Sequence, residues 1–311
     1  MNLQPAFNVS DSVMVDAIVL GYDDLVFLAH SEASLDADKP VSQLIRWTGG
    51  NWVLLGSWPW QGVGVANAGL GGAEDWVVLG RDGEVGRLAR GMSHVDPGED
   101  TLGPFRGLTR LGDRVFAFGM KREVFELEPE DRWVRRMEGF ESEDEDEDDR
   151  PSRKKRLGGL NAVALDAGGV LTAVGMRGEI WVRTDDRWRA CDSPTNVMLK
   201  DVCLGGDGQL HACGLAGTLL SGAGSTWRVV DYQGPEELDF CAIAWFGDAL
   251  YLADGHSVRR LIGDTLELVD FGVDTVVPAA RLVCGESTLL AVAGQEVWQS
   301  MDGYVWRSVL G

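Results

Sequence analysis

The chain has 311 residues, of which 45% are hydrophobic, and it contains 12 Trp, 41 Gly and only 10 Pro. This composition supports a large core with many tight turns and argues against a disordered chain. The formal net charge of -21 disfavours binding to nucleic acid, because phosphate contacts require a basic surface. A basic protein partner fits this charge better.

Five cysteines lie in the second half of the chain, and no two are spaced as C-x-x-C. An odd number in this arrangement argues against a disulfide framework and against a zinc site. Residues 1–12 lack the basic start and apolar stretch of a signal peptide, and no run of 18 apolar residues occurs. We therefore expect a cytoplasmic protein without a membrane span. The cysteines are Cys191, Cys203, Cys213, Cys241 and Cys284.

A repeat of about forty residues runs along the chain. Short apolar runs end in a glycine at regular intervals, and the one long interval holds a charged segment at 141–156, acidic first and then basic. We predict a single domain over residues 1–311 with an insertion at 141–156. The glycines are Gly80, Gly119, Gly175, Gly214, Gly255 and Gly294.

The unit after the charged segment shows the pattern of each repeat most clearly. Apolar and β-branched runs predict three strands, and a glycine-rich turn separates the first two. The strands are expected at 160–165, 170–174 and 179–183, the turn at 167–169, and a fourth strand from Trp188.

A tryptophan opens the fourth strand in five units, and these indoles are expected to pack between neighbouring units. The sixth unit has Leu266 at this position and the second unit has no equivalent. The chain therefore predicts an all-β, seven-bladed β-propeller of four-stranded antiparallel blades, with six blades as the alternative. The five tryptophans are Trp52, Trp133, Trp188, Trp227 and Trp306.

Two short segments, 221–227 and 300–306, read Ser-Gly-Ala-Gly-Ser-Thr-Trp and Ser-Met-Asp-Gly-Tyr-Val-Trp. They resemble degenerate Asp-box turns of BNR-type propellers. The glycine-rich repeat is similar to the photosystem II assembly-factor type of propeller, whereas the Gly-His and Trp-Asp signatures of WD40 repeats are missing. This resemblance implies the fold and leaves the function open.

The BNR resemblance implies a glycan hydrolase only if it brings sialidase chemistry. That chemistry needs clustered arginines, a tyrosine nucleophile and a carboxylate partner. No tyrosine of this chain falls in a recognisable active-site motif. The tyrosines are Tyr22, Tyr232, Tyr251 and Tyr304.

The histidines occupy different positions in four different repeats, which argues against a shared metal site. No H-E-x-x-H, G-x-S-x-G or G-x-x-x-x-G-K-S/T motif occurs. The glycine-rich stretch 62–68 precedes a strand instead of opening a helix, so a phosphate cradle is not expected. The sequence predicts no enzyme activity, no cofactor and no metal. The histidines are His30, His94, His211 and His256.

In a four-stranded blade, the loop between the second and third strands and the connection to the next blade lie on the same face. The longest extra segments, 31–39 and 141–156, fall there, and enlarged loops on one face are candidate binding elements. Aromatic residues are enriched at binding hot spots, and carboxylates steer basic partners. The predicted partner-binding residues are Trp58, Trp60, Asp96, Glu99, Asp100, Glu141, Glu143, Asp144, Tyr232, Glu236 and Glu237.

Two alternatives remain open on this face. Trp58 and Trp60 could cap the core instead of binding, and segment 141–156 could be a solvated loop, because it has no apolar surface to bury. The face also carries bases, so it is not uniformly acidic. These bases are Arg81, Lys121, Arg122 and Arg177.

The leading hypothesis is a non-enzymatic, cytoplasmic protein-binding propeller. Its specific form is an immunity-type inhibitor of a basic toxin or other basic protein, which its charge and lack of catalytic motifs favour. An assembly or scaffold factor for a protein complex is the alternative, and a BNR-like glycan hydrolase comes third. None of these hypotheses involves nucleic acid or a membrane.

Overall fold

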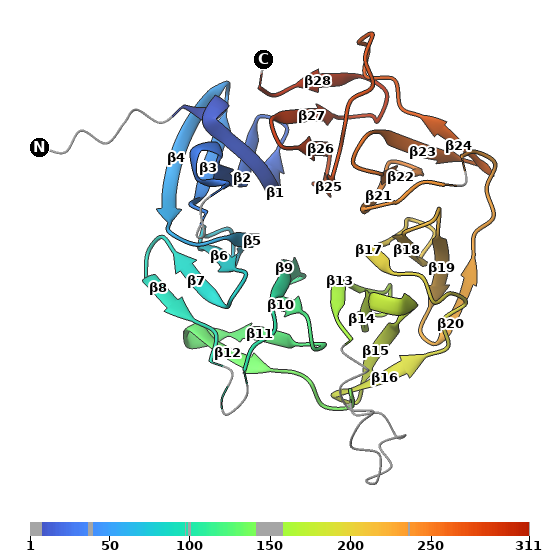
Figure 1. Cartoon of the computed structure of the whole chain (residues 1–311), viewed down its shortest axis with the longest axis horizontal. Coiled ribbons are helices and arrows are strands. Elements are labelled where there is room, and N and C mark those ends of the chain that lie inside the picture. The colour runs from blue at the N-terminus through green and yellow to red at the C-terminus, as the bar shows by residue number, and fades with distance from the viewer. Residues whose placement is uncertain are drawn as a thin grey trace, which may run out of the picture.

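The computed structural model describes residues 8–36, 40–96, 98, 101–140, 158–235 and 237–310, so the predicted insertion at 141–156 lies outside the described residues. The described residues form seven four-stranded antiparallel sheets. The sheets lie around a central axis, and each is built from four consecutive strands (Figure 1). The predicted seven-bladed β-propeller is confirmed, and the six-bladed alternative is wrong.

The blades are numbered in chain order, and the first strand of each lies nearest the axis (Figure 1). Blades one to three comprise β1 (Ser12–Gly21), β2 (Asp24–Ser31), β3 (Ser42–Thr48), β4 (Asn51–Trp58), β5 (Gly62–Asn67), β6 (Trp76–Gly80), β7 (Glu84–Arg87), β8 (Gly91–His94), β9 (Phe105–Leu111), β10 (Arg114–Gly119), β11 (Val124–Glu128) and β12 (Arg132–Arg135).

Blades four to seven follow the same order. They comprise β13 (Leu160–Leu165), β14 (Leu171–Gly175), β15 (Ile180–Thr184), β16 (Arg187–Cys191), β17 (Leu199–Leu204), β18 (Leu210–Gly214), β19 (Leu219–Ala223), β20 (Thr226–Val229), β21 (Ala242–Phe246), β22 (Ala249–Ala253), β23 (Val258–Ile262), β24 (Thr265–Leu268), β25 (Arg281–Cys284), β26 (Leu289–Ala293), β27 (Glu296–Ser300) and β28 (Trp306–Ser308).

Helical structure in the described residues is limited to short 3-10 turns, and none of it is long and apolar enough to cross a membrane. The turns are η1 (Val9–Asp11), η2 (Glu32–Ser34), η3 (Pro129–Asp131) and η5 (Met176–Gly178).

Blade four shows how the sequence sets a hairpin. The Oδ1 atom of Asp166 accepts hydrogen bonds from the backbone N atoms of Gly168 and Val170, at 2.8 and 2.9 Å. Gly169 adopts a φ of 77°, which glycine takes without a steric penalty. The four strands of this blade begin within one residue of their predicted positions.

The repeated glycine closes the second strand for a steric reason. A Cβ atom on Gly175 would collide with the carbonyl oxygen of Gly159, and one on Gly214 would collide with that of Met198. In both blades the chain enters the first strand at this point. The two backbones therefore pass closer than any side chain would allow.

Each pair of neighbouring blades shares one apolar cluster. Three fourth-strand tryptophans, Trp188, Trp227 and Trp306, are buried between their own blade and the preceding one. Leu266 takes the same place in blade six. The expectation that these side chains pack between blades is confirmed, and burial of large aromatic surface is a main source of stability.

The cluster between blades one and two has a different origin. The equivalent position in β8 holds Met92, which is 67% exposed. Trp58 and Trp60, from the end of blade one, fill the interface with ring centroids 5.8 Å apart. A Cβ atom on Gly86 of β7 would lie 2.4 Å from atoms of the Trp58 indole ring and would overlap it. Blade two is therefore shaped to receive an aromatic ring from blade one.

The ring closes between blades seven and one without exchanging a strand (Figure 1). The backbone N atom of Met14 donates to the carbonyl oxygen of Gly294 at 2.9 Å, and Arg281 pairs with Asp16 at 3.0 Å. Apolar residues of both blades pack together beside these contacts. Closure therefore depends on one backbone hydrogen bond, an ion pair and apolar packing instead of a shared sheet.

Candidate functional site

The strand order divides the loops between two faces of the ring. Loops between second and third strands and the connections between blades lie on one face, which we name the connection face. Loops between first and second strands and between third and fourth strands lie on the opposite face, which we name the hairpin face. The described residues predicted to bind a partner, which are Trp58, Trp60, Asp96, Tyr232 and Glu237, belong to the connection face.

Trp58 and Trp60 on this face belong to the core. Their exposed fractions are 6% and 7%, and the carbonyl oxygen of Trp60 accepts a hydrogen bond from Ser42 Oγ at 2.6 Å. This burial agrees with the alternative that the two indoles cap the core. They offer a partner little surface in this structure.

The other described residues of the predicted set are separated across the ring. Asp96, which is exposed, follows β8 at the end of blade two, whereas Tyr232 and Glu237 lie between β20 of blade five and β21 of blade six. The hydroxyl group of Tyr232 donates to the carbonyl oxygen of Gly217 at 3.0 Å. Their binding role stays a prediction. Glu99, Asp100, Glu141, Glu143, Asp144 and Glu236 lie outside the described residues.

Two of the bases predicted on this face have internal partners. Arg122 pairs with Glu179 at 2.6 Å, and Lys121 Nζ donates to the carbonyl oxygen of Thr101 at 2.7 Å. Glu179 also accepts a hydrogen bond from the backbone N atom of Gly159 at 2.9 Å. The contacts of Glu179 hold the entrance to blade four, and its carboxylate offsets the charge of Arg122, whereas Lys121 keeps its positive charge on this face.

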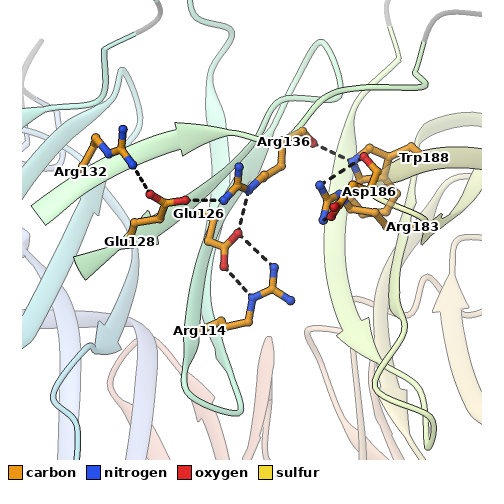
Figure 2. Close-up of polar contacts among 8 residues, drawn as sticks. All are labelled: Arg114, Glu126, Glu128, Arg132, Arg136, Arg183, Asp186 and Trp188. Carbon is orange, nitrogen blue, oxygen red and sulfur yellow. Dashed lines mark hydrogen bonds and ion pairs between the residues drawn. The ribbon is translucent and has the colours of Figure 1, made fainter. Parts of the chain in front are cut away.

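A groove of about 670 Å³ lies between blades three and four. Its lining combines four arginines with three acids, and its ion pairs cross from strand to strand of blade three (Figure 2). No sequence motif predicts this groove, because its lining residues come from separate strands and loops. The lining residues are Arg114, Glu126, Arg136, Glu138, Arg183, Asp186 and Arg187.

Glu126 is the centre of this ion-pair network. It accepts hydrogen bonds from Arg114 Nε at 2.6 Å and from Arg136 Nε at 2.8 Å, and Arg136 continues to Glu128 (Figure 2). Burial by itself would raise the pKa of Glu126, but the hydrogen bonds from Arg114 and Arg136 outweigh it and lower the pKa below the ordinary value. The carboxylate is therefore charged at neutral pH and links the strands of blade three.

On the blade-four side, Arg183 Nη1 lies 3.0 Å from Asp186, and Arg183 Nε is buried without a hydrogen-bond partner among the described residues. The groove thus supplies the clustered arginines of sialidase chemistry. Its lining contains a carboxylate but none of the chain's four tyrosines. The groove does not assemble the three components that a sialidase needs.

The central channel forms a second cavity, of about 590 Å³, lined by the first strands of all seven blades. Its polar side chains join neighbouring blades: Asp16 accepts from the backbone N atom of Val65 at 3.0 Å, and Asp201 accepts from that of Ile243 at 3.0 Å. Burial raises the pKa of Asp201. These carboxylates act as fixed links within the ring.

The histidines have separate local roles. His30 Nε2 lies 2.9 Å from the carbonyl oxygen of Gly62, whereas His211 pairs with Asp207 at 3.1 Å and stacks on Trp245. Within the described part of the chain, no group of three His, Cys, Asp or Glu side chains could hold a metal ion.

Comparison with solved structures defines the class of the protein as a β-propeller. The structure titled "YCF48 from Cyanidioschyzon merolae" matches with a TM-score of 0.66 and 13% identity, covering 94% of this chain and 96% of that one. The structure titled "YCF48 bound to D1 peptide" matches with a TM-score of 0.65 and 11% identity, covering 94% and 92%. The predicted similarity to photosystem II assembly-factor propellers is confirmed at the level of the fold.

At the level of sequence, the chain is similar to the immune protein Tsi7 of Pseudomonas aeruginosa. The two are 29% identical over 302 residues, which cover 94% of this chain and 95% of Tsi7. No protein-family model matches the chain. The similarity to Tsi7 extends across all seven blades, because an alignment of this length leaves no room to omit one.

Proposed function

We propose that this chain is a non-enzymatic immunity-type inhibitor that binds a basic protein in the cytoplasm and blocks its action. The end-to-end similarity to the immune protein Tsi7 carries this proposal. An alignment over nearly the full length of both chains relates the whole ring, including the loops of both faces. The inhibitory role therefore rests on the entire propeller and not on one shared motif.

The physical character of the molecule supports a basic partner. A net charge of -21 accelerates encounter with a positively charged protein and makes the association sensitive to salt. Each blade is tied to the next by an apolar cluster, so the loops are displayed on a rigid frame. A rigid frame lowers the entropy cost of binding.

The other two hypotheses have weaker support. The assembly role rests on similarity to YCF48 at 11–13% identity, which relates folds. The glycan hydrolase would need a tyrosine in the arginine-lined groove, and the groove lacks one. The inhibitor therefore accounts for more of the observations.

Co-expression tests the proposal. The chain is produced in a susceptible bacterium together with the protein encoded by the gene next to its own, and growth is compared with that of cells lacking the chain. Restored growth and a complex that co-purifies are expected. Continued growth arrest in the presence of soluble, folded chain would contradict inhibition. A complex that leaves the partner fully active would favour the assembly role.

The non-enzymatic part of the proposal has its own test. Purified chain is incubated with a panel of chromogenic glycosides, including sialosides, and no release of the chromophore above the buffer control is expected. Turnover that disappears on Arg136→Ala would assign catalysis to the groove and overturn this part.

A further inference from the structure

The loop between β27 and β28 in blade seven differs from the equivalent loops of the other blades. It spans five residues, 301–305, whereas the other loops between third and fourth strands have two or three. It displays Met301, Tyr304 and Val305 on the hairpin face with exposed fractions of 57%, 68% and 73%. Clustered exposure of large apolar side chains marks an interaction site on a soluble protein.

The shape of this loop is fixed by polar residues. Ser300 Oγ accepts a hydrogen bond from the backbone N atom of Gly303 at 2.8 Å. Asp302 Oδ1 accepts from the backbone N atoms of Tyr304 and Val305, both at 2.8 Å, and these bonds lower the pKa of Asp302. Gly303 has a φ of 76°. The three apolar side chains take no part in this framework, so the turn does not explain their presence.

Two residues of blade six contact this loop. The hydroxyl group of Tyr251 donates to the carbonyl oxygen of Gly303 at 3.4 Å. The guanidinium group of Arg260 lies 4.1 Å from the ring centroid of Tyr304, within cation–π range. Ile262, two residues beyond Arg260 and on the same face of β23, is also exposed. Blade six therefore adds an exposed apolar side chain beyond Arg260, on the strand that packs against the loop.

The exposed charge around this surface is negative. Asp248, Asp264 and Glu286 are exposed at the neighbouring hairpin turns of blades six and seven. Arg260 lies against the ring of Tyr304, and Arg307, just beyond the loop, pairs with Asp23 at 2.9 Å. An apolar centre with an acidic rim is complementary to an apolar pocket rimmed by lysine or arginine.

We propose that Met301, Tyr304 and Val305 are the anchor with which this chain docks on its partner, a basic protein whose apolar pocket receives Tyr304. The proposal rests on the proposed inhibitory function for the partner's identity, and it places the contact on the hairpin face. A preformed loop loses little conformational entropy on binding, which is the property of an effective hot spot.

The first experiment uses the triple variant Met301→Ser, Tyr304→Ser, Val305→Ser. Its affinity for the protein encoded by the neighbouring gene is measured by isothermal titration calorimetry, with Leu70→Ser, Met92→Ser as the control. Leu70 and Met92 are as exposed as the anchor residues but lie in blade two. We expect the triple variant to bind at least about tenfold more weakly, with the control and both thermal midpoints unchanged. Wild-type affinity in the triple variant would overturn the proposal.

A second probe separates the anchor from the proposed function. A phage-displayed library of random 12-residue peptides is selected on the wild-type chain. Selected peptides are expected to combine aromatic or aliphatic residues with Lys or Arg, and to lose binding to the triple variant but not to the control. If the protein encoded by the neighbouring gene does not bind, the proposed function is wrong. If the selected peptides bind the triple variant as well as the wild type, or if no peptide is selected, the proposed anchor is wrong.

Discussion

The interface between blades one and two and the interface between blades four and five each place an indole beside a glycine of the outer hairpin. In blade five, Trp227 comes from the blade's own fourth strand and lies against Gly222. In blade two, Trp58 arrives from the preceding blade and lies against Gly86. Both interfaces therefore have the same space beside the glycine, but the indole that fills it comes from a different segment of the chain in each. A repeat fold therefore specifies the volume between blades more strictly than the position of each residue in the repeat.

Removal of either indole, Trp58 or Trp227, should produce the largest loss of stability. Trp58→Ala and Trp227→Ala should each lower the free energy of unfolding by about 3–4 kcal/mol, because each leaves a cavity in a closely packed interface. Urea denaturation of the two variants measures this. Trp58→Ala should keep wild-type affinity for the partner. Weakened binding at full stability would return Trp58 to the partner-binding set.

Adding a methyl group at Gly86, which faces Trp58, should overfill the interface instead of leaving a cavity. Gly86→Ala is expected to destabilise by about 1–3 kcal/mol, because its Cβ atom would overlap the ring of Trp58. Combining it with Trp58→Ala should relieve the overlap, so the double variant loses less stability than the sum of the single changes. Strict additivity in the urea experiment would show that Gly86 and Trp58 do not share this site.

Blade three carries an ion-pair network beside its interface with blade four, because Glu126 accepts hydrogen bonds from Arg114 and Arg136. Glu126→Gln should cost about 1–2 kcal/mol at neutral pH, discounted because the arginines around it are partly open to water. The pKa of folded Glu126 is lowered from 4.5, so its contribution is complete above that pH and is lost as the pH falls through the folded pKa.

The stability gap between wild type and Glu126→Gln should therefore narrow as the pH drops below 4.5. Urea denaturation at a series of pH values from neutral to about pH 3 measures this difference in the free energy of unfolding. Trp58→Ala is the control, because the stability that it loses should depend little on pH. A stability difference that stays unchanged at acid pH would show that the charge of the Glu126 carboxylate does not stabilise blade three.

The smallest effect is expected at the position that the missing tryptophan would occupy. Met92→Trp should change the free energy of unfolding by less than about 0.5 kcal/mol, because Trp58 and Trp60 already fill the interface and the new ring would remain at the surface. Thermal unfolding monitored by circular dichroism suffices. A gain of several degrees would mean that the interface between blades one and two still has an unfilled volume.

Much of the fold could be predicted from the sequence because the repeat carries its own geometry. In blades three, four and five, a backbone contact requires the glycine at the end of the second strand, whereas Gly255 and Gly294 have no such contact and instead adopt a positive φ. The capping role of Trp58, which the sequence leaves open as an alternative to binding, also has a signal in the repeat. The lack of a tryptophan in the second unit and the pair of tryptophans just before it are both visible in the sequence, but they belong to different units and had to be considered together.

The candidate sites were harder to predict for a physical reason. Arg114, Arg136 and Arg183 meet only through the packing of two blades, and no spacing in the sequence encodes that meeting. The turn at 300–306 resembles an Asp box in sequence, yet apolar residues such as Met301 and Tyr304 are typical of a buried core. Their exposure depends on how Asp302 directs the backbone of the loop.

The most direct test of the account is the affinity of the chain for the protein encoded beside it, measured by calorimetry at about 50 and about 500 mM NaCl. An acidic ring that attracts a basic partner should form a complex at both concentrations and bind at least about tenfold more weakly in the higher salt. No complex at either concentration, or an affinity that does not change with salt, would contradict the account.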